Sequence, residues 1–171
     1  MKKMDKNAFF PLSYGVYIIT SKYEENFSGC VVNTVCQITA EDKPKLTVAV
    51  NKENYTTELM QKSKKVNIAV LAQDTEFLLI GKFGFRTGRD YNKLEDTMYI
   101  TGENGIPIIT ESAVSYIECN ILQEIDCSSH ILFVLEAQEA SVLNNKPALT
   151  YDYYHKVLKG KTPPKASSYS R

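Results

Sequence analysis

The chain has 171 residues, of which 43% are hydrophobic and 23% charged, which is typical of a globular protein that buries roughly 70% of its unfolded surface. Its twenty basic and twenty acidic residues cancel, so we expect no electrostatic attraction to nucleic acid or anionic lipid. No apolar run approaches the ~20 residues that cross a bilayer, and no signal-peptide cleavage site follows the N-terminal apolar stretch, so we expect a cytoplasmic protein.

Seven or so strands dominate the predicted secondary structure. Each is a run of β-branched, aromatic or alternating apolar residues between turn-forming residues. In the third strand Leu46, Val48 and Val50 alternate and are expected to point inward. The last segment is predicted as a short strand or a turn. In chain order the predicted segments cover residues 11–20, 27–39, 45–51, 66–72, 114–127, 130–143 and 147–155.

Two short helices are predicted between these strands. Asn54 is the expected N-cap of the first helix, which ends near residue 63. Asp74 is the expected cap of the second, which carries apolar residues at helical spacing as far as Gly84. A polar loop over residues 85–96 follows this second helix.

The order of these elements favours a barrel over a nucleotide-binding α/β fold. Strands follow one another in runs, and there is no GxGxxG or P-loop motif. A closed or partly closed antiparallel barrel explains this order and removes exposed strand edges. We predict a single domain over residues 1–171, with an extended Pro- and Ser-rich tail from about residue 156.

Residues that hydrolases and metal sites need are scarce in this chain. There is no GxSxG motif, and only two histidines are available as general bases. The four cysteines form no CxxC pair and lie at no ligand spacing from a histidine, so we predict structural thiols and no metal site. If the protein is an enzyme, a bound organic cofactor is expected to carry the chemistry.

Residues 33–39 indicate a possible ligand site. Asn33 and Gln37 lie four residues apart and would share one face of a single strand, among small side chains. Asn is depleted in strands, and amide donors and acceptors suit the edge of a flavin or pterin ring. A solvent-exposed strand face is the alternative.

Two further stretches suit a phosphate group. Residues 51–56 lead from a strand into a helix, where Lys52, Asn54 and the free amide groups of the first turn would meet an anion. Residues 81–93 concentrate lysines and arginines in a glycine-containing loop that could close on phosphate. A capped helix and a solvated loop are the alternatives.

Together these segments resemble a known family. NTVCQIT, NKENYT, GKFGFRTGRD and ALTYDYYHKVLKGKTPP are similar, in order and spacing, to segments of the flavin reductase-like, FMN-binding split-barrel proteins. The nearest resemblance is to flavoredoxins and to the flavin domain of high-molecular-weight rubredoxins, and it runs from about Leu12 into the tail. It implies a mainly β fold, an antiparallel six-stranded Greek-key split β-barrel with short helices.

The resemblance also implies an activity. Such proteins bind FMN near a homodimer interface, take hydride from NADH or NADPH, and pass electrons to free flavin or to a redox protein such as a rubredoxin. The chain would then be an NAD(P)H:FMN oxidoreductase. An FMN-binding electron carrier or sensor that NAD(P)H does not reduce directly is an alternative, and an enzyme similar to pyridoxamine-phosphate oxidase is another.

Carried over residue by residue, the resemblance implies a flavin site. His130 would face the flavin and the nicotinamide as the catalytic residue, although its lead-in here is CSSH where the family commonly has Gly-Asp-His. Tyrosines beside His155 would pack over the flavin, across a dimer interface or against the C-terminus. The implied cofactor-binding residues are Asn33, Thr34, Val35, Gln37, Thr39, Asn51, Lys52, Asn54, Thr56, Lys82, Phe83 and Arg89.

Overall fold

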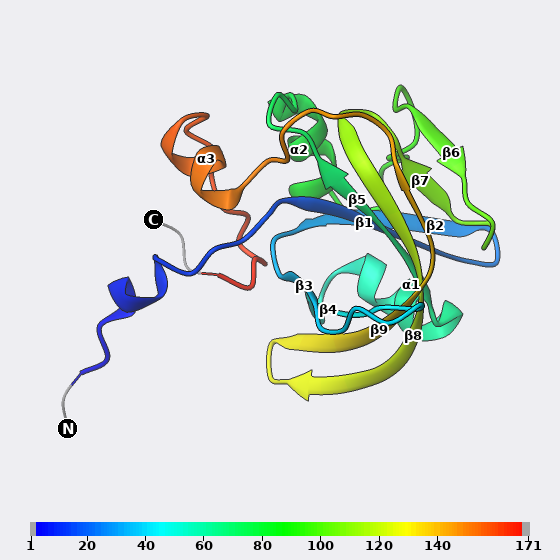
Figure 1. The fold of residues 1–171 in the computed structure, drawn as a ribbon, viewed down its shortest axis with the longest axis horizontal. Coiled ribbons are helices and arrows are strands. Elements are labelled where there is room, and N and C mark those ends of the chain that lie inside the picture. The colour runs from blue at the N-terminus through cyan, green and yellow to red at the C-terminus, as the bar shows by residue number, and fades with distance from the viewer. Residues whose placement is uncertain (1–2, 169–171) are drawn as a thin grey trace.

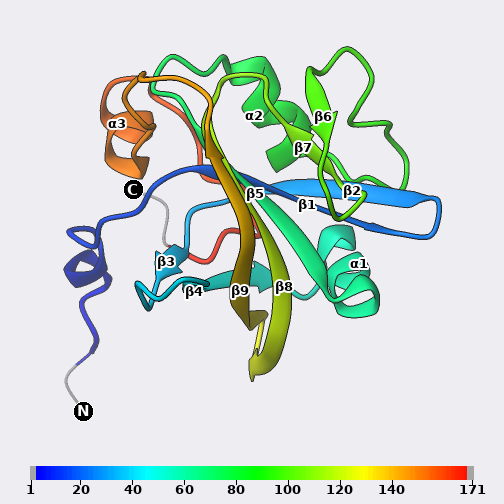
Figure 2. The same cartoon turned by 45° about the vertical axis from the view of Figure 1, so that its right-hand side comes forward.

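An antiparallel sheet that curls into a split barrel forms the body of the protein in a computed structural model, which describes residues 3–168 (Figures 1 and 2). Seven strands form this sheet in the order β2-β1-β5-β8-β9-β4-β3, and two more form a separate hairpin. The strands are β1 Tyr17–Tyr23, β2 Asn26–Val32, β3 Val35–Gln37, β4 Lys45–Asn51, β5 Lys65–Leu71, β6 Tyr99–Thr101, β7 Pro107–Ile109, β8 Ala113–Cys127 and β9 His130–Val142. The helices are the 3-10 turn η1 Lys6–Phe9, α1 Tyr55–Ser63, α2 Phe77–Gly84 and α3 Tyr151–Lys156.

The two outer strands of the sheet are neighbours in the chain. β2 ends at Val32 and β3 begins at Val35, so Asn33 and Thr34 carry the chain from one edge of the sheet to the other. The predicted single strand over residues 27–39 is therefore wrong. The side chains of Asn33 and Thr34 make hydrogen bonds of their own at this point, and the strand ladder is interrupted. The mainly β split barrel is confirmed, and this interruption raises its strand count from six to seven.

Apolar alternation along the strands builds the interior of the barrel. Leu46, Val48 and Val50 are buried as predicted, and they pack in one cluster with Phe133 and Leu135 of the neighbouring strand β9. A second cluster lies between the sheet and the helices α2 and α3. The helix α1 contacts β1 and β2, and the helix α2 contacts β2, so both helices that precede the long hairpin β8–β9 lie against this part of the sheet.

The helix caps differ in part from the prediction. Asn54 does occupy the N-cap position of α1, but its side chain makes no capping hydrogen bond. Asp74 does not cap α2, because Glu76 holds that position while Asp74 forms an ion pair with Lys146 at 2.7 Å. The cap of α1 therefore leaves the first-turn amide groups without a side-chain acceptor.

Two segments have structure that the sequence pattern did not indicate. The predicted strand or turn over residues 147–155 ends in the helix α3, which Thr150 caps by accepting a hydrogen bond from the amide of Tyr153 at 3.1 Å. Residues 99–109, for which no element was predicted, form the β6–β7 hairpin. The first strand begins at Tyr17 rather than at residue 11.

Both ends of the chain lie on the side of the barrel where α3 packs (Figure 1). The N-terminal segment with η1 projects from the barrel, whereas the tail after α3 returns toward β3. Within residues 3–168, no helix has both the length and the apolar character that a membrane span requires.

Candidate functional site

Two adjoining cavities lie at the split of the barrel. We call them the junction cavity, beside the Asn33–Thr34 junction, and the loop cavity, beside the loop that follows α2. Cys30, Asn54 and Gly84 line both, so the cavities share a wall. The junction cavity is also lined by Asn33, Asn51, Ile80, His130, Tyr151 and Tyr154, and the loop cavity by Ser28, Thr56, Phe83, Arg86, Gly88 and Lys93.

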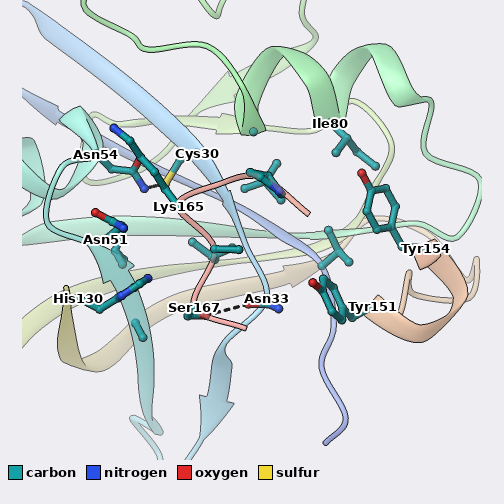
Figure 3. A pocket seen from close by; sticks show the side chains of 18 residues that line it. Cys30, Asn33, Asn51, Asn54, Ile80, His130, Tyr151, Tyr154, Lys165 and Ser167 are labelled. Atoms are coloured by element: carbon teal, nitrogen blue, oxygen red, sulfur yellow. Dashed lines mark hydrogen bonds between the residues drawn. The ribbon is translucent and has the colours of Figure 1, made fainter. Parts of the chain in front are cut away.

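Amide side chains converge on the junction cavity from three elements (Figure 3). Asn33 comes from the β2–β3 junction and is 5% exposed. Asn51 ends β4 and accepts a hydrogen bond from the amide of Glu53 at 2.9 Å. Asn54 precedes α1, and its Nδ2 lies 3.8 Å from the Sγ of Cys30. These amides supply donors and acceptors to a cavity that Tyr151 and Tyr154 also line.

His130 brings an unsatisfied polar atom to the same cavity. It begins β9 and is the cross-strand partner of Asn51. Its Nδ1 lies 2.8 Å from the Oγ of Ser129, whereas its Nε2 is buried and has no hydrogen-bond partner within residues 3–168. Because a buried polar atom without a partner costs about 1–3 kcal/mol, a ligand that meets Nε2 would remove a penalty present in the fold.

The loop cavity has the features of an anion site. The first turn of α1 opens on it, and the partial positive charge of a helix N-terminus attracts an anion. Thr56 in that turn is buried, and its Oγ1 lies 2.9 Å from the Oγ of Ser28. Arg86, from the loop after α2, also lines this cavity and adds a cation.

Lys93 is a buried cation at the base of the loop cavity. Its side-chain Nζ donates to the carbonyl oxygens of Gly29, at 2.6 Å, and Phe83, at 3.2 Å. Burial lowers the pKa of Lys93 to about 8, while Cys30 opposes that shift. A negative charge in this cavity would hold Lys93 in its ammonium form.

The Cys30 thiol, which lines both cavities, is uncharged at neutral pH. Burial raises the pKa of Cys30 to about 11, and burial likewise raises the pKa of Cys119 to about 12. These two fit the prediction of structural thiols, whereas Cys36 and Cys127 are exposed. Among the described residues, no group of three or more His, Cys, Asp or Glu side chains is placed to hold a metal ion.

The structure brings together six of the thirteen residues that the resemblance implies. The junction cavity contains four of them and the loop cavity adds two more, with Asn54 shared between the two. The two tyrosines of the segment beside His155, Tyr151 and Tyr154, also reach the junction cavity. The implied residues that line a cavity are Asn33, Asn51, Asn54, Thr56, Phe83 and His130.

The remaining implied residues lie outside the walls of both cavities. Thr34 adjoins the junction and donates to the carbonyl of Ala49 at 3.2 Å, while Val35 packs on the barrel core. Each of the other five side chains bonds elsewhere. Gln37 donates to the Thr39 carbonyl, Thr39 accepts from the Lys45 amide, Lys52 pairs with Asp126, Lys82 donates to the Glu95 carbonyl and to Thr97, and Arg89 pairs with Glu58.

The site contains features that the sequence pattern did not single out. Lys93 was one cation among several in the loop over residues 81–93, and only the tertiary structure distinguishes it by burial. The quoted segments of the resemblance end at Pro164, and no site residue was predicted in the tail, yet Pro163, Lys165, Ala166 and Ser167 line the junction cavity.

Comparison with known sequences identifies similar proteins. A sequence model described as "Flavin reductase like domain" matches residues 9–159. The ferric-chelate reductase (NAD(P)H) of Archaeoglobus fulgidus is 41% identical over 97% of this chain and 98% of its own length. The high molecular weight rubredoxin of Moorella thermoacetica is 39% identical over 98% of this chain and 72% of its own length.

Solved structures share the fold at lower sequence identity. The NADH:FAD oxidoreductase of Streptomyces globisporus superposes with a TM-score of 0.75 at 19% identity, over 84% of each chain. An FMN-binding protein from Thermus thermophilus superposes with a TM-score of 0.75 at 20% identity, over 88% of each chain. These likenesses confirm the predicted split barrel.

Proposed function

Because the chain belongs to the flavin reductase-like family, we propose that it is an oxidoreductase that binds FMN and passes electrons from NADH or NADPH to free flavin or a redox protein. The observation that carries the proposal is the buried Nε2 of His130, which lacks a partner within residues 3–168 and lines the junction cavity. A flavin ring at this place would satisfy that atom.

The adjoining cavities fit a ligand with a polar-edged ring at one end and a phosphate at the other. Asn33 and Asn51 would bind the ring edge, since their amides offer both donors and acceptors. The first turn of α1, with Thr56 and Lys93, would bind the phosphate. A single anion subsite supports the mononucleotide FMN.

A bound flavin would supply hydride acceptance and onward electron transfer, and the protein would position the reactants. Apolar side chains in the junction cavity, including Val16, Val32 and Ile80, would keep water from the ring. Amide donors at the ring edge would stabilise negative charge as it develops there. His130 would offer Nε2 as a hydrogen-bonding group beside the reacting rings.

The relatives support the electron donor and the acceptor. One relative is named as a ferric-chelate reductase that uses NAD(P)H, and the chain covers nearly all of that protein. Another is named as a high molecular weight rubredoxin, and the chain covers 72% of it. We therefore include a rubredoxin-like redox protein among the acceptors to be tested.

We also propose that two copies pair with FMN near their interface. Exposed apolar side chains on the N-terminal segment support this arrangement, among them Phe9 and Leu12. Phe9 also lines a third cavity, which His130 and Tyr151 share, so this segment adjoins the proposed site.

The direct test is an anaerobic titration of the FMN-loaded protein with NADH and then with NADPH, following the visible absorbance of oxidised flavin. Loss of that absorbance with either nucleotide is the expected result, and it identifies the donor. Dithionite provides the control for complete reduction.

If dithionite bleaches the bound flavin but neither nucleotide does, the nicotinamide-dependent activity is contradicted. That outcome would favour the electron carrier reduced by another protein. A protein that takes up no FMN would overturn both functions.

A further inference from the structure

The C-terminal tail, residues 163–168, runs through the junction cavity (Figure 3). Ala166 and Ser167 line this cavity and also the third cavity on its other side, so the tail stands between the two. With the tail in this position, the free space of the junction cavity is only about 50 Å³. Ligand pockets usually measure roughly 300–1,000 Å³, so a flavin ring and this tail cannot share the cavity.

The tail uses the same polar groups that the proposed flavin site needs. The Nδ2 of Asn33 donates to the Oγ of Ser168 at 2.7 Å, and its Oδ1 accepts from the Oγ of Ser167 at 3.0 Å. Both hydrogen-bonding ends of the amide are therefore engaged by the tail. Ser167 also lies 3.3 Å from the Oγ1 of Thr34, and Ser168 donates to the Tyr151 hydroxyl at 3.1 Å.

The remaining attachments of the tail are weak enough to be reversible. Pro163 lies over Gly84 at the end of α2. Lys165 forms a solvent-exposed ion pair with Glu53 at 3.5 Å, and exposed ion pairs contribute little to stability. Ser167 itself is exposed. The tail thus closes the cavity through a few hydrogen bonds, without a deeply buried apolar anchor.

We propose that residues 163–168 are a displaceable plug that competes with flavin for the Asn33 amide and the junction cavity. This inference rests on the proposed flavin site. Flavin would bind only to molecules whose tail has left, so the apparent dissociation constant is the intrinsic constant divided by the fraction of open molecules. The rival arrangement is a cover that folds over bound flavin and strengthens its binding.

Limited trypsin digestion of the full chain separates these two arrangements. A plug that flavin displaces exposes the Lys165–Ala166 bond, so FMN is expected to speed cleavage there by about tenfold. Cleavage after Lys6, in the N-terminal segment, serves as the internal reference. A cover would instead protect the Lys165–Ala166 bond, and either protection or an unchanged rate would overturn the plug.

The affinity of a tail variant for FMN provides a second test, because the plug predicts tighter binding and the cover predicts weaker binding. The double variant Ser167→Ala and Ser168→Ala removes the hydroxyls that hold Asn33, and we expect FMN to bind about three- to tenfold more tightly. Ser141→Ala, on β9 and outside the cavities described, is the matched control with no expected change. Weaker or unchanged binding by the double variant would overturn the plug, whereas absence of FMN binding by all three proteins would overturn the proposed function as well.

Discussion

His130 combines a fixed orientation with an unsatisfied atom, which makes it the residue best placed to act on a bound ring. Ser129 fixes one nitrogen of the imidazole, so that Nε2 remains available within the described part of the chain. Loss of a hydrogen bond to a group that gains charge during reaction costs about 1.5–3 kcal/mol. We therefore expect His130→Ala to slow flavin reduction by NADH or NADPH by about 10- to 100-fold.

Stopped-flow measurement of that step at saturating nucleotide checks the prediction. Gln123→Ala, at an exposed position on the neighbouring strand β8, is the control and should leave the rate unchanged. An unchanged rate in His130→Ala would remove this residue from the chemistry and leave it as a wall of the cavity.

Because Lys93 titrates near pH 8, we expect the affinity for FMN to depend on pH. In the free protein its pKa is lowered from 10.5 to about 8 by burial. An FMN phosphate beside it would stabilise the ammonium form, so binding above pH 8 takes up a proton. We expect FMN affinity to fall by up to about tenfold for each pH unit above 8.

Fluorescence titration of FMN across this pH range measures the effect, and Lys93→Met isolates it. The variant should bind FMN more weakly at neutral pH and lose the alkaline decline. Lys82→Met, whose Nζ contacts the Glu95 carbonyl and Thr97 outside both cavities, should keep the decline. A decline of equal slope in all three proteins would mean that another group titrates.

A buried carboxylate holds the loop that connects β6 and β7. Glu118 on β8 is 2% exposed and accepts hydrogen bonds from the amides of Glu103 and Asn104, each at 3.1 Å. Two donors would lose their acceptor in Glu118→Ala. We expect that variant to lower the free energy of unfolding by about 2–4 kcal/mol in urea denaturation.

Glu139 provides the matched control, because it is the cross-strand partner of Glu118 on β9 and is exposed. Glu139→Ala should change the free energy of unfolding by no more than about 0.5 kcal/mol. Equal effects of the two substitutions would mean that Glu118 contributes through strand propensity alone.

At the element scale, periodicity predicted the long strands and failed where side chains compete with the backbone. The alternation of Leu46, Val48 and Val50 was a sufficient signal for β4. Residues 27–39 divide at Asn33 and Thr34, where Thr34 bonds to the Ala49 carbonyl and Asn33 contacts the tail, more than a hundred residues later in the chain; no local pattern contains these contacts. Tyrosine favours strands, yet the tyrosines of α3 are helical, in a segment that Thr150 caps by accepting a hydrogen bond from the Tyr153 amide.

The residues of the candidate site likewise fall into those that local segments implied and those that only the assembled fold brings together. Asn33, Asn51 and His130 were implied by a resemblance in local segments, and they do line one cavity. Gln37 and Lys52 belong to the same segments but have other partners: Gln37 lies on β3, after the junction, and bonds to the Thr39 carbonyl, while Lys52 pairs with Asp126. Burial of Lys93 and the path of the tail depend on the assembled fold, so sequence alone could not specify them.

At the scale of the whole molecule, the N-terminal segment stands out because it extends away from the barrel and carries exposed apolar side chains. It projects from the barrel beside α3, with Phe9 40% exposed and Leu12 51% exposed (Figure 1). Apolar side chains on a projecting segment gain stability by packing on a second copy, which would also shield the cavity that Phe9 and His130 share.

If this segment forms the homodimer interface, charges on it should separate the subunits. We expect the double variant Phe9→Asp and Leu12→Asp to elute as a monomer in light-scattering chromatography, whereas the unmodified chain elutes as a dimer, because each buried carboxylate would lack a partner. Val142→Asp, which adds a charge at an exposed apolar position at the end of β9, is the control and should remain dimeric. FMN affinity should fall together with dimerisation, since the segment borders the flavin site. A monomeric unmodified chain, or a double variant that stays dimeric, would show that this segment does not hold two copies together.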